Sequence, residues 1–408
     1  MASQGNKLSF IAASLSLMVT YVASASAIPL YGIYQVEDGL NYTDLALSSV
    51  LYFIGAVLAL IVLGRLSNFF GRKPISIAAV VMSGISSLLF LAIHDAAPLL
   101  LGRFLQGLAC GLASTALAAW VTDCAKKVPS WVAPVVISCG PMTGLTIGGI
   151  GSGLLVEYVP YPRVFPFIIV AIFSLMSAGL LFVAQETMDK SKGALGSLIP
   201  RFSLPPAARR AFPLAACTFT ATWALGGFFQ AFGPSMAREQ LHSSSAVAAA
   251  LVFASMMAPS SLGASIASRL SAKAAQTVGM LLFTVFLYGV ILSLKFGILS
   301  TFLAASVLTG AAQGIVLTGS IRTMISGLKP EERANVFAVI YATSYMGAAI
   351  PTLISGRLSS EFTLLEVSVG YGALATLASI IVLASLVMAF RHKQLVMKSI
   401  ETESVKGY

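Results

Sequence analysis

Twelve apolar stretches, separated by short polar breaks, constrain this chain of 408 residues more than any other feature. A helix needs roughly 20 apolar residues to cross the hydrocarbon core of a bilayer. The stretches are Leu8–Tyr34, Asp44–Leu63, Ile75–Ile93, Pro98–Thr122, Trp131–Val156, Val164–Ala184, Ala211–Ala237, Ser244–Gly263, Ala275–Leu294, Ile298–Ile325, Ala334–Gly356 and Val367–Phe390. Only 10% of the residues are charged, against about 25% in soluble domains. The sequence therefore predicts an all-α integral membrane protein with twelve transmembrane helices.

The first stretch has an alternative interpretation as a cleavable signal peptide. Lys7, an apolar run and the small residues ASASA at 23–27 fit that pattern. The run is long for a signal, however, and Pro29, Leu30 and Tyr31 continue it beyond the small residues. We therefore interpret this stretch as the first transmembrane helix.

The basic charge reports how the chain is oriented in the membrane. The chain has 25 Lys and Arg and a net charge of +10. With the N-terminus in the cytoplasm, the outer loops receive four of these residues: Arg163, Arg238, Lys295 and Arg357. Nearly all the others fall on the cytoplasmic side, as the positive-inside rule requires. The sequence thus predicts two cytoplasmic termini in a bacterial inner (plasma) membrane, and the charge needs no nucleic-acid partner.

Residues that would carry enzyme chemistry are not grouped along the sequence. The four cysteines are scattered, and no pair has the spacing of metal ligands or of a disulfide framework. There is no Ser/His/Asp set and no phosphate-binding loop. We expect no catalytic residue, no metal and no cofactor, which leaves transport or reception as the classes of function.

A polar segment at 185–210 divides the chain into two parts with the same number of apolar stretches. We predict an N-terminal six-helix half (1–184), a cytoplasmic linker (185–210), a C-terminal six-helix half (211–390) and a cytoplasmic tail (391–408). The two halves share sequence features at equivalent positions. An offset of 207 residues aligns Gln106 and Gly107 with Gln313 and Gly314. Duplicated halves are typical of transporters that rock one half against the other.

The segment GRLSNFFGRKP at 64–74 is a basic, glycine-containing break between the second and third stretches. Gly64 lets the end of the second helix approach a neighbour closely. Gly71 permits a tight turn, and Arg72 and Lys73 suit the anionic inner leaflet.

This segment resembles the loop between spans two and three of the major facilitator superfamily, through Gly64, Leu66, Gly71, Arg72 and Lys73. In that family the loop gates the transition between two states, and an acid stands where this chain has Asn68. The resemblance implies a gating set of Gly64, Asn68, Gly71, Arg72 and Lys73. A charge at a helix end contributes about 0.3–1 kcal/mol, so we expect a weaker inner gate. The alternative is a loop that sets topology and packing alone.

Two further motifs carry the resemblance. LLLGRFLQG at 99–107 is similar to the family's span-four motif, through Arg103, Gln106 and Gly107. Gly144, Gly148 and Gly153 match part of the span-five glycine motif of the drug:proton antiporter branch, with Gly149 in place of its proline. The resemblance implies close helix packing at these three glycines.

In the family, spans one, four, seven and ten line the substrate cavity. On those spans the resemblance implies the cavity residues Tyr21, Tyr31, Arg103, Gln106, Trp223, Gln230 and Gln313. Their hydroxyl, amide and aromatic groups suit a modest-sized, partly apolar solute. Trp223 could serve packing alone, Arg103 and Arg322 could extend to the membrane surface, and Pro234 can break span seven near its outer end.

Ionisable groups are missing from the middle of the spans. All 15 acids and all three histidines lie in loops, tails or span ends, whereas pumps usually keep such groups within the membrane. We expect a neutral, zwitterionic or anionic small-molecule substrate. A proton remains open as the coupling ion, with Asp44, Asp123 and Glu157 as carboxylates at span edges.

The sequence as a whole predicts a secondary active transporter that works by alternating access as a monomer in the lipid bilayer. The drug-efflux motif favours export of a drug or metabolite. Uptake or facilitated exchange of a small metabolite is the alternative, and a non-transporting membrane receptor is a third possibility.

Overall fold

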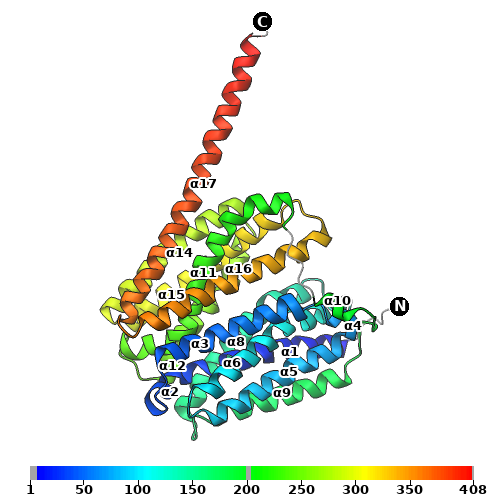
Figure 1. Cartoon of the computed structure of the whole chain (residues 1–408), viewed down its shortest axis with the longest axis vertical. Coiled ribbons are helices and arrows are strands. Elements are labelled where there is room, and N and C mark those ends of the chain that lie inside the picture. The colour runs from blue at the N-terminus through cyan, green and yellow to red at the C-terminus, as the bar shows by residue number, and fades with distance from the viewer. Residues whose placement is uncertain (1–6, 199–203, 407–408) are drawn as a thin grey trace.

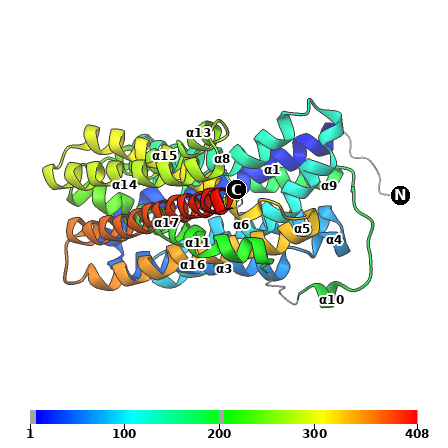
Figure 2. The ribbon, with the colours of Figure 1, turned by 90° about the horizontal axis from the view of Figure 1, so that it is seen from above.

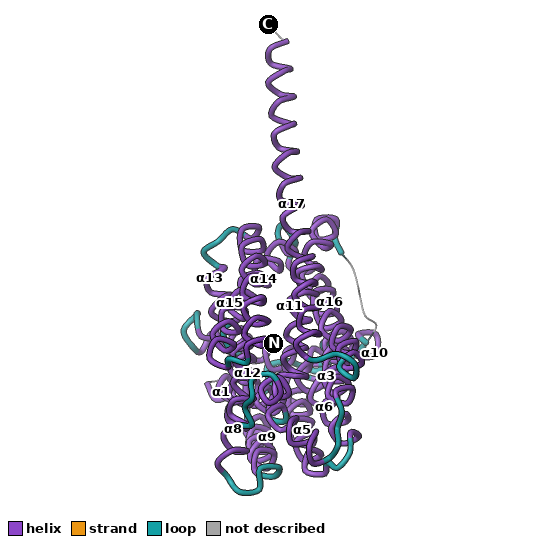
Figure 3. The backbone as a smooth tube through the Cα atoms, turned by 90° about the vertical axis from the view of Figure 1, so that its left-hand side faces the viewer, coloured by secondary structure: helices purple, strands orange, loops and turns teal. Residues whose placement is uncertain are grey.

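The structure, a computed structural model, describes residues 7–198 and 204–406. In these residues the chain is helical with connecting loops, as Figure 3 shows, and twelve of its helices are long and apolar enough to cross a membrane. The predicted all-α fold with twelve transmembrane helices is therefore confirmed.

The N-terminal half holds the first six spans. Its elements are α1 (Lys7–Ala25), η1 (Ile28–Leu30), α2 (Tyr31–Glu37), α3 (Tyr42–Leu58), η2 (Ala59–Leu63), α4 (Ser67–Phe70), α5 (Arg72–Leu89), η3 (Phe90–Ala92), α6 (Ala96–Leu112), η4 (Ala113–Leu117), α7 (Ala118–Asp123), η5 (Ala125–Lys127), α8 (Val132–Tyr158) and α9 (Phe165–Val183). The segments η2 and η4 are π-helical and lie in spans two and four.

The C-terminal half holds the other six spans. After α10 (Ala194–Ser197) come α11 (Pro206–Glu239), α12 (Ala246–Met257), α13 (Ser260–Ala267), α14 (Ala272–Phe296), α15 (Leu299–Ile325), α16 (Pro330–Leu358) and α17 (Leu364–Lys406). Figure 1 shows this half above the N-terminal half, with α17 extending far beyond the bundle. Figure 2 shows α10 set apart from the bundle, on the segment between the halves.

Proline does not break span seven. The sequence suggested a break at Pro234, but α11 continues through Pro213 and Pro234 to Glu239. Pro234 is fully surrounded by other residues, so neighbouring helices hold the backbone in place despite the missing N–H, as is common within membranes.

Equivalent glycines build the same helix crossing in each half. A Cβ atom on Gly107 would overlap the carbonyl oxygen of Tyr52, where α6 crosses α3. A Cβ atom on Gly314 would overlap the carbonyl oxygen of Ser260, where α15 crosses α13. These two glycines are the pair that the 207-residue offset superposes, so the repeat in the sequence is a repeat of helix packing.

The seam between the halves is formed by α3 against α16 and by α8 against α12. We call the end at which α1 begins the inner end, following the orientation predicted from the loop charges. The loops that follow α2, α8, α11 and α16 lie at the opposite, outer end.

Candidate functional site

The first span is interrupted where it meets spans four and five. Helix α1 ends at Ala25, and the chain resumes through η1, whose Pro29 has no N–H to donate. Side chains from two neighbouring spans bind the carbonyl groups at this break. Arg103 Nη1 donates to the Ser24 oxygen at 2.5 Å, Gln106 Nε2 to the Ala23 oxygen at 2.7 Å and Ser152 Oγ to the Ser26 oxygen at 2.5 Å.

The Arg103 side chain is fully buried and points towards span one. It also donates to Gln106 Oε1 at 2.7 Å, and its guanidinium carbon lies 4.5 Å from the centre of the Tyr52 ring. A cation suits the negative end of the α1 dipole, and the aromatic face adds a cation–π contact. Extension of Arg103 to the membrane surface is therefore excluded.

Two nitrogen atoms of Arg103 are left available. Neither Nε nor Nη2 has a hydrogen-bond partner among the described residues, although both are buried. Desolvating such donors without a partner is costly. Each of these N–H groups could therefore donate to an oxygen atom of a bound solute.

Aromatic side chains from four helices gather beside Arg103. We call Tyr21, Tyr52, Phe53, Trp223 and Tyr345 the central aromatic cluster. The rings of Trp223 and Tyr345 lie 4.8 Å apart, and those of Phe53 and Tyr345 lie 5.9 Å apart. The cluster joins α1 and α3 of one half to α11 and α16 of the other.

The central aromatic cluster also has polar atoms. The Tyr21 hydroxyl pairs with Ser114 Oγ at 2.6 Å, within the π-helical segment η4. Such segments are frequent at functional sites. The arrangement can hold an apolar or aromatic group while it offers hydroxyls and a guanidinium to polar atoms.

The other predicted cavity residues lie apart from Arg103, Gln313 at the middle of span ten and Gln230 and Tyr31 nearer the outer end. Gln313 of α15 lies opposite Gly226 of α11, and its Oε1 atom is buried without a partner among the described residues. Gln230 is half-buried two helical turns along α11 from Trp223. Tyr31 pairs with Ser48 at 3.2 Å within an apolar cluster. The structure thus brings Tyr21, Arg103, Gln106 and Trp223 to one region and leaves Tyr31 outside it.

Spans two and eleven supply residues that the sequence did not single out. Tyr52 and Tyr345 complete the central aromatic cluster, but the family pattern directed attention to spans one, four, seven and ten. An aromatic residue near the middle of each of these two spans was the available signal.

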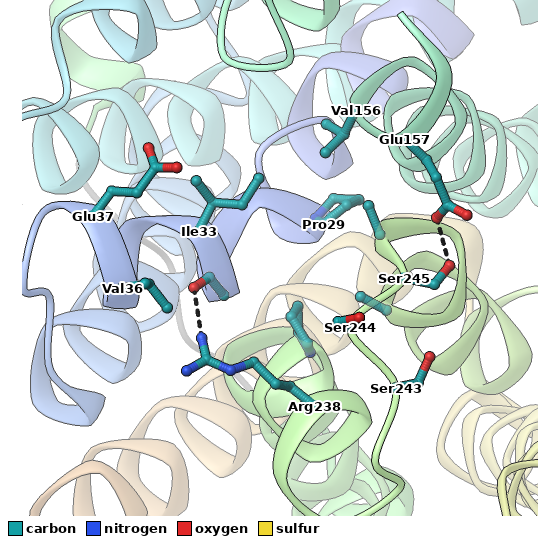
Figure 4. Close-up of a pocket in the computed structure, with 14 residues that line it drawn as sticks. Pro29, Ile33, Val36, Glu37, Val156, Glu157, Arg238, Ser243, Ser244 and Ser245 are labelled. Atoms are coloured by element: carbon teal, nitrogen blue, oxygen red, sulfur yellow. Dashed lines mark hydrogen bonds between the residues drawn. The ribbon is translucent and has the colours of Figure 1, made fainter.

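At the outer end, side chains bond the two halves across a cavity of about 740 Å³ (Figure 4). Glu157, at the end of α8, accepts hydrogen bonds from Ser245 Oγ and from the Val247 N–H at 2.9 Å. It thereby places a carboxylate at the N-terminus of α12 in the other half, where the helix dipole favours negative charge. Arg238 donates to the Gly32 carbonyl oxygen at 3.1 Å on the opposite side of the cavity.

Three further hydrogen bonds join the two halves at the outer end. Ser235 donates to Gln35 at 2.8 Å, Thr43 donates to the Gly356 carbonyl oxygen at 3.1 Å, and Tyr42 donates to Glu239. Each joins one half to the other, so hydrogen bonds bridge the halves on both sides of the outer cavity.

The inner loop is folded around the predicted gating residues. Gly71 has a φ of 98°, which favours glycine, and a Cβ atom there would meet Glu186. The Glu186 carboxylate accepts from the backbone N–H groups of Arg72 and Lys73, both at 2.9 Å, at the start of α5. This acid from the end of span six supplies negative charge to the loop and was not anticipated.

Asn68 takes part in the same loop through a neutral oxygen. Arg72 Nη1 donates to Asn68 Oδ1 at 2.6 Å, and Arg72 Nε donates to Asp123 at 3.0 Å. Lys73 Nζ donates to the Phe182 carbonyl oxygen at 3.0 Å, and a Cβ atom on Gly64 would lie 3.0 Å from Thr115. The gating set therefore joins span two to the ends of spans four and six within one half.

Among the described residues, one long polar contact joins the halves at the inner end. Arg65 Nη2 lies 3.4 Å from Asn335 Oδ1, at the long limit for a hydrogen bond. In the part of the chain that the structure describes, the polar contacts between the halves are therefore concentrated at the outer end.

The predicted packing glycines of span five face two partners. A Cβ atom on Gly144 would come within 2.7 Å of the Met18 carbonyl oxygen, and one on Gly148 would overlap Val22, both on α1. A Cβ atom on Gly153 would lie 2.7 Å from Ala250 of α12. Span five therefore packs closely on span one and also across the seam.

Arg322, near the inner end of span ten, binds the end of a neighbouring helix. Its Nη1 atom donates to the carbonyl oxygens of Ala267 and Leu270, both at 2.9 Å, and so caps the end of α13. These carbonyl oxygens are left unsatisfied by the end of the helix and are available to a nearby donor. Among the described residues, no three His, Cys, Asp or Glu side chains are grouped to hold a metal ion.

Comparisons with known proteins agree with this architecture. The chain is 30% identical over 161 residues to an uncharacterized transporter of Rickettsia felis, a match of 39% of this chain and 37% of the relative. It is 30% identical over 106 residues to the multidrug resistance protein MdtL of Klebsiella pneumoniae, covering 25% of this chain and 26% of the relative. The matched segments therefore span about a third and a quarter of these relatives.

A solved structure, that of the nucleoside transporter NupG, has the same fold, with a TM-score of 0.69 at 12% identity over 92% of this chain and 99% of that one. The family model described as Major Facilitator Superfamily matches residues 13–350. The chain belongs to the major facilitator superfamily of membrane transporters.

Proposed function

We propose that the protein is a secondary active transporter that exports a small molecule by alternating access. The observation that carries this proposal is the asymmetry of the seam. Glu157 and Arg238 bond the halves at the outer end, whereas Arg65 and Asn335 approach each other at 3.4 Å at the inner end. A transporter that rocks about a central site needs such a pair of alternating contacts.

Substrate binding is assigned to the central aromatic cluster and Arg103. The rings of Tyr21 and Trp223 offer apolar surface, and the free Nε and Nη2 atoms of Arg103 are hydrogen-bond donors. Arginine always carries its charge and has no acceptor. The site therefore favours a partly apolar solute with a neutral, zwitterionic or anionic polar group.

Export is favoured by two observations. The glycines Gly144, Gly148 and Gly153 resemble part of the span-five motif of drug exporters, and one group of relatives is named for multidrug resistance. Uptake or exchange of a small metabolite is the second candidate, supported by the likeness to a structure named as a nucleoside transporter.

The distribution of charged residues supports a location and an orientation in the membrane. The basic residues are concentrated on the loops at the inner end. We propose a monomer in the bacterial inner membrane with both termini in the cytoplasm.

The proposal is tested by expression in a bacterial strain that lacks its own drug exporters. Growth and intracellular accumulation are measured over a panel of amphipathic toxic compounds and metabolite analogues, for the wild type and for Arg103→Ala at matched membrane abundance. We expect the wild type to lower accumulation of at least one compound and the variant to lose this effect. Accumulation that rises with the wild type, for every compound affected, would instead establish uptake.

A further inference from the structure

A crevice in the side of the bundle opens between α3 and α16, on the seam between the halves. It has a volume of about 260 Å³. One side comes from residues 53–62 of span two, and the other comes from Tyr345, Met346 and Ala349 of α16. No charged residue lines it.

The crevice faces the hydrocarbon of the bilayer. Ile54, Leu58 and Met346 are 42%, 41% and 48% exposed on the outside of the bundle. Thr43 and Gly356 join the same two helices nearer the outer end. The crevice lies further along both helices, so it opens towards the inner leaflet, on the side where the halves are less tightly bonded.

Tyr345, a member of the central aromatic cluster, stands between the crevice and Trp223. Its side chain lines the crevice, and its ring lies 4.8 Å from that of Trp223 behind it. The residue is 8% exposed, and its ring also lies 5.9 Å from that of Phe53. Aromatic contacts therefore hold the ring between the crevice and Trp223.

The crevice also includes part of the π-helical segment η2. Ile61 and Val62 of this segment line it. A π-helical turn interrupts regular hydrogen bonding and is often found at functional sites. Span two can therefore deform beside the opening at lower cost than a regular helix.

We propose that this crevice admits the hydrocarbon tail of a single-chain amphipathic substrate from the inner leaflet, with Tyr345 as the side-chain gate to Trp223 and Tyr21, the inner members of the central aromatic cluster. The inference rests on the proposed transport function and specifies its substrate class. Because the bilayer and the crevice are both apolar, a tail can pass between them without exposing apolar surface to water.

The size of the crevice selects this occupant. Pockets that enclose a whole drug-sized ligand measure about 300–1,000 Å³, so a space of about 260 Å³ holds only a section of one hydrocarbon tail. A two-chain lipid would leave its second chain and headgroup outside. The head of a single-chain molecule would meet the paired hydroxyls of Tyr21 and Ser114 beyond the gate.

The test uses tryptophan fluorescence. The chain has three tryptophans, and Trp120→Phe with Trp131→Phe leaves Trp223 as the reporter. The protein is reconstituted in phosphatidylethanolamine and phosphatidylglycerol vesicles that contain either dibromostearate or a phospholipid with brominated chains, at equal bromine content. We expect dibromostearate to quench Trp223 at least twofold more strongly than the brominated phospholipid.

Variants on the same helix locate the effect. Met346→Phe fills the crevice and should reduce quenching by dibromostearate at least by half. Ile350→Phe is the matched control, because Ile350 is 51% exposed on α16 but does not line the crevice. Tyr345→Ala removes the gate and should increase quenching.

Equal quenching by the two brominated compounds would overturn the proposal, because bulk lipid would then fill the crevice. Equal effects of Met346→Phe and Ile350→Phe would overturn it as well. The measurement needs no transport. The quenching experiment can therefore give a negative result even if export is established. If export is disproved, the quenching result still shows whether a tail enters the crevice.

Discussion

The guanidinium group of Arg103 donates a hydrogen bond of 2.5 Å to the carbonyl oxygen of Ser24, at the point where the first transmembrane helix is interrupted. This bond ties span four to the broken end of span one. The same cation lies over the Tyr52 ring at the edge of the central aromatic cluster. Arg103 therefore connects the backbone of span one with the proposed substrate site.

Arg103→Lys is expected to lower transport at least about tenfold, since hydrogen bonds to charged groups contribute about 1.5–3 kcal/mol. Lysine keeps the charge but loses the planar group that reaches Ser24, Gln106 and the Tyr52 ring together. The rate is measured at matched expression with a compound identified in the growth panel. Arg357→Lys, at an exposed outer position, is the control. If the lysine variant transports at a near wild-type rate, the central role assigned to Arg103 is contradicted.

Asn68→Asp is expected to shift the protein towards the inner-closed state. The new carboxylate would lie within 2.6 Å of Arg72 Nη1, and it would restore the charge that the family carries in this loop. Labelling of cysteines introduced on the cytoplasmic side of the cavity should fall about two- to fivefold, as a helix-end charge of about 0.3–1 kcal/mol predicts. Asn68→Ala serves as the neutral comparison. Identical labelling of the aspartate and alanine variants would argue against a gating role.

Gly107→Ala is expected to impair folding, because its Cβ atom would overlap the backbone of Tyr52. Overpacking of this kind costs about 1–3 kcal/mol or more. Gly314→Ala should behave alike at the equivalent crossing in the other half. Gly151→Ala is the control, since nothing lies within 4 Å of the added atom. Thermal stability in detergent measures the effect, and equal stability of all three variants would contradict the packing account.

Helix number and the repeat could be predicted because they depend on local features. Each span is a run of apolar residues, and the Gly107 and Gly314 pair keeps its spacing in both halves. The motif residues of the inner loop also proved to be neighbours, with Arg72 bonded to Asn68.

The partners of the buried residues could not be read from the sequence. Glu157 is at a span edge, and only the fold reveals that it lies on the start of α12. Tyr345 enters the site because α16 packs against α3, a contact between residues far apart in the chain. Only the fold shows that Arg322 of span ten donates to a carbonyl oxygen at the end of α13.

An imposed pH difference is expected to have little effect on transport in reconstituted vesicles. The edge carboxylates already have structural partners, since Asp123 pairs with Arg72, Asp44 accepts from the Asn41 N–H at the start of α3 and Glu157 accepts from the Val247 N–H at the start of α12. Substrate movement is followed down its own gradient with and without a pH difference. Accumulation that is driven by the pH difference, and that Asp44→Asn, Asp123→Asn or Glu157→Gln abolishes, would establish proton coupling instead.

The central claim, that the halves alternate between outer and inner contacts, is tested most directly by spin-label distances in Glu157→Gln. This variant keeps the shape of the side chain but removes the charge at the start of α12. Glu37→Gln is the control, because Glu37 lines the same outer cavity but pairs with Arg163 of its own half at 3.0 Å. One pair of labels, at Val36 and Ser244, spans the outer cavity, and a second pair, at Phe70 and Arg333, spans the inner end.

We expect the outer distance to lengthen and the inner distance to shorten together in Glu157→Gln, with a population change of about two- to fivefold. The Glu37→Gln protein should match the wild type. If both distances stay unchanged in Glu157→Gln, or if both lengthen, the halves do not alternate about a central site and the account is contradicted.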